Sequence, residues 1–310
     1  MEKVLITGCS GYVGSVLTGY FLDEGYPVTG FDNQLYNKTS LLQYCDHPNF
    51  TFINGDVRDL YSLQRELNKN DIIISLAALV GASLCDKNPV DAQLINADVN
   101  SFLANHKSKD QKLIYFNTNS GYGETDGSSI CTEESPLSPV SLYGQTKCQA
   151  EDIIKSVDNH LIFRLATVFG PSPRPRTDLL VNNLVLKALK EKYIVLYENQ
   201  SMRNYIHVKD VCLAVIHCLN NWELCKNEIY NVGNDDLNMN KLSLCEKINE
   251  YIPIEIIKAE YTKDPDKRNY IVSSQKIYNK GFQCQYDLDY GIKGLMKMYS
   301  MLNDLWYANY

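Results

Sequence analysis

Gly8-Cys9-Ser10-Gly11-Tyr12-Val13-Gly14 follows directly on the apolar run Lys3–Ile6 and leads into an amphipathic stretch, Tyr12–Glu24. This order is typical of the first strand, loop and helix of a dinucleotide-binding unit, where free N–H groups at the helix N-terminus suit a pyrophosphate. Glycine-rich turns are common, however, and the spacing is Gly-x-x-Gly-x-x-Gly, so an ordinary strand-to-helix turn is the alternative. The cofactor contacts expected from this loop are Gly8, Gly11, Tyr12, Val13 and Gly14.

Strand-like and helical patterns alternate up to residue 165. The candidate strands are Lys3–Ile6, Val28–Phe31, Phe50–Ile53, Ile72–Leu76, Leu113–Asn117 and Leu161–Leu165. The candidate helices between them are Tyr12–Glu24, Ser62–Asn68, Val90–Asn105 and Ser141–Val157. Such alternation predicts an α/β fold with a doubly wound parallel sheet, the Rossmann type. We expect a cofactor-binding domain over residues 1–170, to which later segments return, and a smaller substrate-binding lobe over 171–310.

The composition excludes several classes of protein. The chain has 310 residues, 45% of them hydrophobic and 22% charged, close to the average for folded domains. A net charge of −7 lacks the broad positive field that non-specific nucleic-acid binding needs. The longest apolar runs, such as Ile72–Val80, are far shorter than the roughly 20 residues of a membrane span. The ten cysteines contain no Cys-x-x-Cys pair, so we expect reduced thiols, a cytoplasmic location and no metal site.

Polar and small residues follow the later strands where a dinucleotide would need them. Asp32 ends the second strand, and Asn33 comes next. A carboxylate there accepts hydrogen bonds from ribose hydroxyls and repels a 2′-phosphate, which favours NAD over NADP. Two further segments fit the adenine and the pyrophosphate-ribose portion and complete the predicted cofactor contacts: Asp56-Val57 after the third strand and Leu76-Ala77-Ala78 after the fourth.

Tyr143-Gly144-Gln145-Thr146-Lys147 places a phenol and an ammonium four residues apart on one helical face. A tyrosine has a pKa near 10, so it serves as a base near neutral pH only beside a positive charge. Lys147 supplies that charge, and Thr118 at the end of the fifth strand offers a hydroxyl on the same side of the sheet. The alternatives are a solvated helix face for the pair and a turn-capping role for Thr118.

These residues together resemble the extended short-chain dehydrogenase/reductase superfamily, in its nucleotide-sugar epimerase/dehydratase branch, from Val4 to Ile277. Motifs at the family's spacing are Gly8/Gly11/Gly14, Asp32, Asp56-Val57, Ala77-Ala78, Asn96, Thr118, Tyr122-Gly123, Tyr143/Lys147, Arg164–Gly170 and Arg203–Val208. The resemblance implies that Tyr143 is the general base, that Lys147 lowers its pKa and holds the nicotinamide ribose, and that Thr118 shares the substrate hydrogen bond. It also implies a cofactor contact at Asn96 and a homodimer formed through Val90–Asn105 and Ser141–Val157.

The residues after Thr118 bear on the reaction that is catalysed. Relatives that eliminate water carry an Asp-Glu pair there, whereas this chain has Asn119-Ser120, and neither shuttles a proton near neutral pH. We therefore expect oxidation at C4 of a nucleotide-linked sugar, followed by release of the 4-keto sugar or by hydride return that gives an epimer. A non-catalytic NAD-binding regulator is a third possibility, disfavoured by the intact Thr118, Tyr143 and Lys147.

Finer signatures concern the substrate. Thr118–Gly123, Glu133–Leu137 and Asp264–Arg268 look most like bacterial GDP-D-glycero-D-manno-heptose 4-dehydrogenases of surface-polysaccharide pathways. That resemblance implies a second small substrate, such as a keto acid, to reoxidise the NADH. The expected contacts with the nucleotide-diphosphate sugar are Thr118, Asn119, Ser120, Arg174, Asn182, Arg203 and Arg268. Guanidinium groups suit the diphosphate, although most arginines are surface charges.

Overall fold

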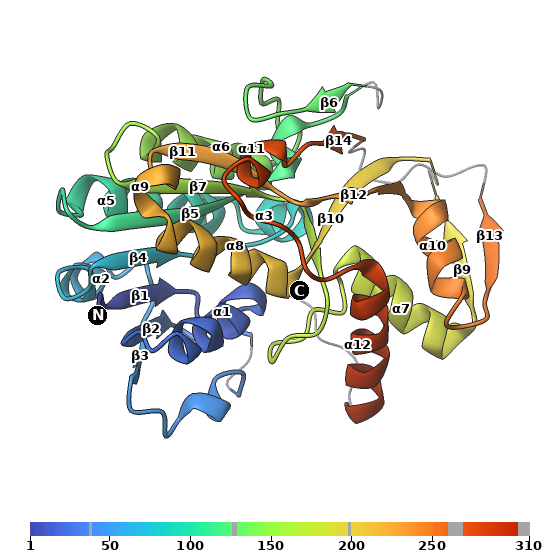
Figure 1. Cartoon of the computed structure of the whole chain (residues 1–310), viewed down its shortest axis with the longest axis horizontal. Helices are drawn as coiled ribbons and strands as arrows, with labels where there is room; N and C mark the ends of the chain where they lie inside the picture. The colour runs from blue at the N-terminus through green and yellow to red at the C-terminus, as the bar shows by residue number, and fades with distance from the viewer. Residues whose placement is uncertain (37–38, 126–128, 198–199, 260–268, 303–310) are drawn as a thin grey trace.

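The computed structural model describes residues 1–36, 39–125, 129–197, 200–259 and 269–302. Its main layer is a seven-stranded parallel sheet in the order β3-β2-β1-β4-β5-β7-β11 (Figure 1). The strands are β1 (Val4–Thr7), β2 (Val28–Asp32), β3 (Phe50–Asn54), β4 (Ile72–Ser75), β5 (Lys112–Thr118), β7 (His160–Leu165) and β11 (Glu228–Val232). Because the chain winds outward from β1 in both directions, the predicted doubly wound fold is confirmed.

Helices cover both faces of this sheet, which is why its strands read as continuous apolar runs. Val4 and Ile6 pack toward α1 (Tyr12–Asp23) and α8 (Val208–Asn220), whereas Leu5 packs toward α2, α5 and α6 on the other face. The remaining helices around the sheet are α2 (Leu60–Leu67), α3 (Ala82–Lys87), α4 (Pro89–Gln93), α5 (Val99–His106), α6 (Leu142–Ile154), α9 (Trp222–Cys225) and α11 (Gln275–Tyr278).

Two elements differ from the sequence prediction. The stretch Val90–Asn105 is not one regular helix, because a π-helical turn, Leu94–Asp98, separates α4 from α5. That turn carries Asn96, whose amide is bonded to a loop of the sheet, and such long-range bonds leave no periodic signal in the sequence. The second difference is β11, which adds a seventh strand beside β7 from a part of the chain that follows residue 170.

A second group of elements forms a separate hydrophobic core beyond the carboxyl ends of the strands (Figure 1). Its core joins Val181 and Val185 of α7 to Ile248 of α10 and Ile292 of α12. The elements outside the main sheet are β8 (Thr167–Phe169), β9 (Tyr193–Leu196), β10 (Met202–His207), β12 (Asn234–Asn240), β13 (Glu255–Lys258), β6 (Ile130–Cys131), β14 (Ile271–Val272), α7 (Leu180–Glu191), α10 (Lys241–Asn249), α12 (Leu288–Met301) and the short 3-10 turns Leu42–Tyr44 and Asn119–Tyr122.

Hydrogen bonds fasten helix α1 to the segment that follows β8. Tyr12 Oη donates to the carbonyl oxygen of Gly170 at 2.7 Å, and Ser172 Oγ donates to the carbonyl oxygen of Tyr12 at 2.8 Å. Asn182 Oδ1 accepts from the Gly170 N–H at 3.0 Å, and its Nδ2 donates to the Arg176 carbonyl oxygen at 3.0 Å. The buried side chains of Tyr12 and Asn182 therefore hold the two parts of the molecule together, and their contact with a ligand stays a prediction.

All ten cysteines are free, as the sequence predicts. In the described ranges, no helix is long and apolar enough to cross a bilayer. The cytoplasmic location stays a prediction.

Candidate active site

Two glycines at the junction of β1 and α1, Gly8 and Gly14, have no space for a side chain. Gly8 has φ +75°, and a Cβ there would meet the backbone nitrogen of Ala77 at 2.6 Å. A Cβ on Gly14 would lie 2.2 Å from the carbonyl oxygen of Gly8. Among the described groups, no side chain caps the first turn of α1, so its N–H groups remain available to an anion. The loop is therefore a bare backbone cradle at a helix N-terminus, which suits a pyrophosphate.

Asp32 lies beside this loop at the end of β2. Its Oδ2 accepts from the Ser10 N–H at 2.9 Å and its Oδ1 from the Gln34 N–H at 2.7 Å. Burial raises the pKa of Asp32, while these two backbone donors lower it. Asn33 and Asp56 form the next hydrogen-bonded pair along this edge of the sheet. The Nδ2 of Asn33 donates to the Oδ2 of Asp56 at 3.2 Å.

The loop after β4 is held by a fully buried amide. Asn96 Oδ1 accepts from the Leu79 N–H at 2.9 Å, and Nδ2 donates to the Leu79 carbonyl oxygen at 3.0 Å. Asn96 Nδ2 also lies 3.3 Å from Thr146 Oγ1 on α6. These bonds tie the loop that follows β4 to α6, and the backbone of Ala77 in that loop lies beside Gly8. The amide of Asn96 is thus occupied by the protein, and its predicted contact with the cofactor is not tested.

Helix α6 carries the predicted phenol and ammonium. Ser141 caps its start by accepting from the Gly144 N–H at 3.2 Å. Tyr143 lies in the first turn, partly buried against Leu79 and Cys85. Lys147 is 4% exposed, and burial lowers its pKa to about 7. The lysine side chain therefore sits in a desolvated site and not on a solvated helix face.

Thr118, Asn119 and Ser120 form the turn at the carboxyl end of β5. Thr118 Oγ1 accepts from the Ser120 N–H at 3.1 Å and donates to Ser120 Oγ at 3.0 Å. The capping role that was the alternative for Thr118 is thus present, and the residue is partly exposed. Asn119 is 1% exposed, and neither of its amide atoms has a partner among the described residues.

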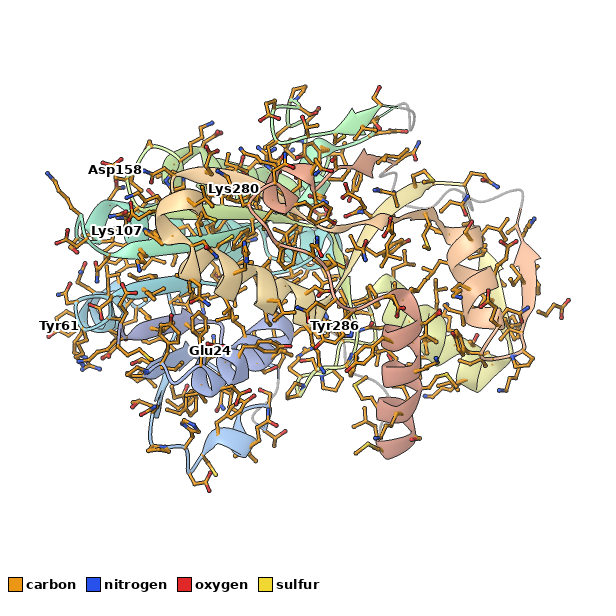
Figure 2. The ribbon with its side chains drawn as sticks, in the orientation of Figure 1. Glu24, Tyr61, Lys107, Asp158, Lys280 and Tyr286 are labelled. Atoms are coloured by element: carbon orange, nitrogen blue, oxygen red, sulfur yellow. The ribbon has the colours of Figure 1, made fainter. Side chains whose placement is uncertain are left out.

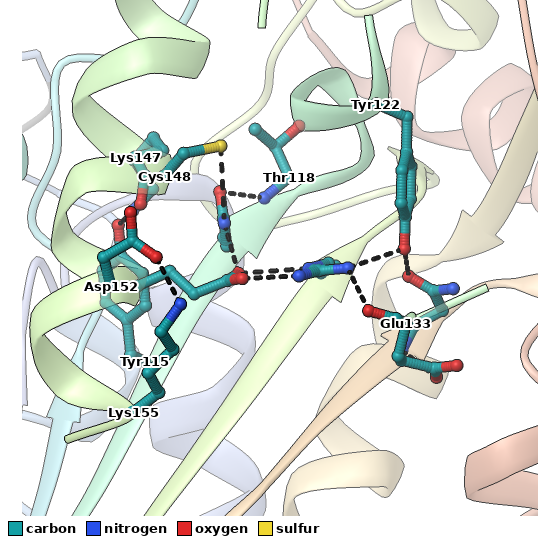
Figure 3. A network of polar contacts seen from close by, with 12 residues as sticks. Tyr115, Thr118, Tyr122, Glu133, Lys147, Cys148, Asp152 and Lys155 are labelled. Carbon is teal, nitrogen blue, oxygen red and sulfur yellow. Dashed lines mark hydrogen bonds and ion pairs between the residues drawn. The ribbon is translucent and has the colours of Figure 1, made fainter. Parts of the chain in front are cut away.

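A buried ion pair joins α6 to β7 (Figure 3). Arg164 donates from Nε to Glu151 Oε2 at 3.1 Å and from Nη2 to Glu151 Oε1 at 2.5 Å. The side chains are 5% and 2% exposed. Asn117 Nδ2 donates to Glu151 Oε2 at 2.5 Å, and Asn117 Oδ1 accepts from the Thr118 N–H at 2.7 Å. This chain of bonds runs from α6 to the backbone of Thr118.

The same network extends to β11. Arg164 Nη1 donates to Tyr122 Oη and to the Glu133 carbonyl oxygen, each at 3.0 Å (Figure 3). Tyr122 Oη lies 2.6 Å from Asn231 Oδ1, and Glu133 Oε1 accepts from the Asn231 N–H at 2.6 Å. Other polar side chains point outward, as Tyr61 and Asp158 show at the rim of the molecule (Figure 2). The buried network therefore links β5, α6, β7 and β11.

The predicted substrate residues are spread over two places. Arg174, in the loop after β8, is 3% exposed, donates to the Pro175 carbonyl oxygen at 2.7 Å and lies 5.3 Å from the ring of Tyr36. Burial lowers the pKa of Arg174 to about 10. Arg203 on β10 is 2% exposed and faces the ring of Tyr270 at 5.6 Å. Both arginines are buried, so neither is an ordinary surface charge. Arg268 lies outside the described residues.

Sequence reasoning missed three residues that the structure brings to the site. Glu151 lies one helical turn beyond Lys147, a spacing that could have marked it. Tyr115 and Asn117 alternate with Phe116 on β5, and this alternation could have placed both on the face toward α6.

The arrangement fits a dinucleotide and a polar substrate. The backbone at Gly8 and Gly14 leaves no room for side chains, the buried hydroxyl of Ser10 lacks a partner among the described groups, and Asp32, predicted to meet the ribose, lies beside the loop. In the same described ranges, no cluster of three His, Cys, Asp or Glu is placed to hold a metal ion. The described residues thus include a glycine loop at a helix N-terminus and a Tyr-Lys pair on α6.

Comparison with known proteins agrees with this geometry. Residues 4–233 match the model of the NAD dependent epimerase/dehydratase family. The low-salt glycan biosynthesis protein Agl12 of Haloferax volcanii is 26% identical, over 96% of this chain and 98% of its own length. The uncharacterized UDP-glucose epimerase YtcB of Bacillus subtilis is 30% identical, over 74% of this chain and 76% of its own.

Solved structures share the fold. The dTDP-glucose 4,6-dehydratase of Bacillus anthracis, in complex with NAD, superimposes with a TM-score of 0.86 at 24% identity, covering 99% of each chain. The UDP-glucuronic acid 4-epimerase of Bacillus cereus, in complex with UDP-glucuronic acid and NAD, gives a TM-score of 0.84 at 23% identity, covering 97% of this chain and 100% of its own.

Removal of Glu151 is expected to destabilise the protein strongly. Glu151→Leu leaves the Arg164 guanidinium buried without its carboxylate, which costs about 3–5 kcal/mol of unfolding free energy. The control is Asp152→Leu at the next position, where an exposed pair with Lys155 is lost at a cost below about 1 kcal/mol. Urea unfolding of both variants measures the difference, and equal losses would contradict the role of the buried pair.

Removal of the Lys147 charge is expected to stabilise the fold while it abolishes activity. Because burial lowers the pKa of Lys147 from 10.5 to about 7, the unfolded chain binds the extra proton between these values. Lys147→Met should therefore raise the unfolding free energy by on the order of 2–4 kcal/mol at pH 7 and below, and the gain should shrink as the pH rises toward 10. Lys155→Met, exposed on the same helix, is the control, and thermal unfolding across pH gives the readout. A gain that does not vary with pH would refute the assignment.

Proposed function

Because the chain belongs to the NAD dependent epimerase/dehydratase family, we propose that it oxidises the C4 hydroxyl of a nucleotide-diphosphate sugar, with Tyr143 as the base. The family match confirms NAD as the predicted cofactor. The observation that carries the proposal is the desolvated ammonium of Lys147, one helical turn from Tyr143 on α6. Glu151 of the same helix is bonded to Asn117, and Asn117 is bonded to the backbone of Thr118.

The roles of the residues follow from charge and position. Tyr143 removes the hydroxyl proton of the sugar, and Lys147 stabilises the phenolate that must form first. In a desolvated site an ammonium and a nearby phenolate each favour the charged form of the other. Thr118 holds the sugar hydroxyl through its own partly exposed hydroxyl. NAD, when bound, accepts the hydride that leaves C4.

The turn after Thr118 argues against water elimination. That reaction needs an acid and a base beside the sugar, and this position offers the amide of Asn119 and the hydroxyl of Ser120. The chemistry therefore stops at C4. Diphosphate contacts at Arg174, Arg203 and Arg268, and sugar contacts at Asn119 and Ser120, belong to the same proposal, as does the homodimer.

Net oxidation of a GDP-linked heptose or hexose for surface-polysaccharide synthesis is the form of the proposal that we favour. Its support is the resemblance of Thr118–Gly123 and Glu133–Leu137 to such 4-dehydrogenases, together with similarity to a protein named for glycan biosynthesis. Oxidation without hydride return leaves NADH, so a small keto acid is then needed as the second substrate.

A 4-epimerase is the second candidate. Similarity to YtcB, named as a UDP-glucose epimerase, favours it, and the residues required for the first half of the reaction are the same. The two activities differ in whether the keto sugar rotates and is reduced again before it leaves.

Tyr143→Phe tests the base. Loss of the phenol removes the proton acceptor, so turnover should fall by about 100-fold or more. Cofactor binding should change by less than about twofold, measured as the dissociation constant of NADH from its fluorescence. Tyr61→Phe, at an exposed site on α2, should change neither. Activity of Tyr143→Phe near that of the wild type would overturn the assignment.

Product analysis separates the two candidate reactions. Incubation with GDP- and UDP-linked sugars, followed by mass spectrometry and chromatography, should yield a 4-keto sugar with one NADH for each sugar oxidised. An isomeric sugar with no net NADH would identify an epimerase instead, and absence of both from every sugar tested would contradict the proposed chemistry.

A further inference from the structure

Tyr115 lies directly beneath the catalytic lysine. It is fully buried on β5, and the Nζ of Lys147 stands 4.1 Å from the centroid of its ring. The hydroxyl of Tyr115 donates to the carbonyl oxygen of Lys147 at 3.0 Å, so ring and hydroxyl grip the same residue at two points (Figure 3). Burial raises the pKa of Tyr115 well above its ordinary value, and the neighbouring phenol of Tyr143 raises it further.

The other groups around Lys147 supply little negative charge. Cys85 on α3 and Cys148 on α6 face it, and burial raises the pKa of each thiol to about 11, so both are uncharged near neutral pH. Glu151, one turn along the helix, is committed to Arg164. Within the described residues, no carboxylate forms an ion pair with Lys147. The face of an aromatic ring is therefore the main favourable partner of this ammonium, and such contacts are strongest where water is excluded.

We propose that Tyr115 is a positioning residue of the catalytic pair, whose ring keeps the Lys147 ammonium charged beside Tyr143 and whose hydroxyl fixes the backbone of that helical turn. The inference rests on the proposed function for the role of the pair, but the contact itself does not depend on it. Tyr115 touches neither substrate nor cofactor in this arrangement and acts through Lys147.

The spacing of strand and helix supports this role. Tyr115 and Asn117 are two residues apart on β5, about 6.6 Å along the strand, and they contact Lys147 and Glu151, four residues apart and about 6 Å along the helix. The spacing of the two contacts along the strand therefore matches their spacing along the helix, and α6 is held against β5 in one register. A shift of that register would move Tyr143 as well.

Two variants separate the ring from the hydroxyl. Tyr115→Phe keeps the ring and loses the bond to the Lys147 carbonyl oxygen, whereas Tyr115→Leu loses both. Each is made in the natural chain and in a Lys147→Met background, and unfolding free energies are measured at about pH 5.5 and about pH 9.

The expected result depends on the charge of Lys147. A ring that stabilises the ammonium raises the folded-state pKa of Lys147, so its loss costs most at low pH, where the lysine is charged, and less at high pH, where it is neutral. For each pH, the folding equilibrium constant of Tyr115→Leu is divided by that of Tyr115→Phe. This ratio should be about 5-fold lower at the lower pH than at the higher pH. In the Lys147→Met background this ratio should be the same at both pH values. A ratio independent of pH in the natural chain would overturn the proposal.

Kinetics give the second readout. Tyr115→Leu should lower kcat by about tenfold with KM for the sugar within about twofold, and Tyr115→Phe should retain at least about a third of kcat. Equal kcat values for the two variants would overturn the catalytic consequence of the ring. If the wild type oxidises no nucleotide sugar, the proposed function fails, and the pH-dependent unfolding still decides whether the ring holds the ammonium.

Discussion

Strand β5 and helix α6 meet at two matched contacts on which the active site depends. The ring of Tyr115 contacts the ammonium of Lys147, and the amide of Asn117 donates a hydrogen bond to Glu151. Arg164 on the neighbouring strand forms an ion pair with the same Glu151. These contacts fix how far the helix slides and turns on the sheet. The positions of Tyr143, one turn earlier, and of the Thr118 backbone, bonded to Asn117, follow from the same constraint.

The chemistry explains why so much charge is buried here. In the proposed function Lys147 stabilises a phenolate where water does not screen it, and that same environment lowers the pKa of Lys147 and destabilises the fold. The bidentate pair of Arg164 and Glu151 carries no such conflict, because each charge meets its partner and further hydrogen bonds. Hydrogen-bonded and ion-paired side chains thus lie near one ammonium group whose burial is energetically unfavourable. Groups with such perturbed pKa values are common at functional sites.

The parallel sheet was predictable because its strands are apolar on both faces and alternate with helical patterns. The glycine loop and the Tyr143/Lys147 pair were predictable because each is defined by short spacings within one turn or helix. The structural roles of Asn96, Tyr12 and Asn182 were harder to predict. Their side chains bond Leu79, Gly170 and Arg176, and the first two of these partners lie far away along the chain. Strand β11 was missed for a similar reason, since its pairing with β7 leaves no local signature.

The amino-acid sequence alone determined the order of most strands and helices, the glycine loop and the candidate reacting side chains, because these depend on local periodicity and on chemical type. Tertiary structure decided which of the polar residues are free to meet a ligand and how acidic the lysine is. Burial and hydrogen-bond partners set those properties, and both arise only when segments distant in the chain, such as β5, α6 and β7, pack together.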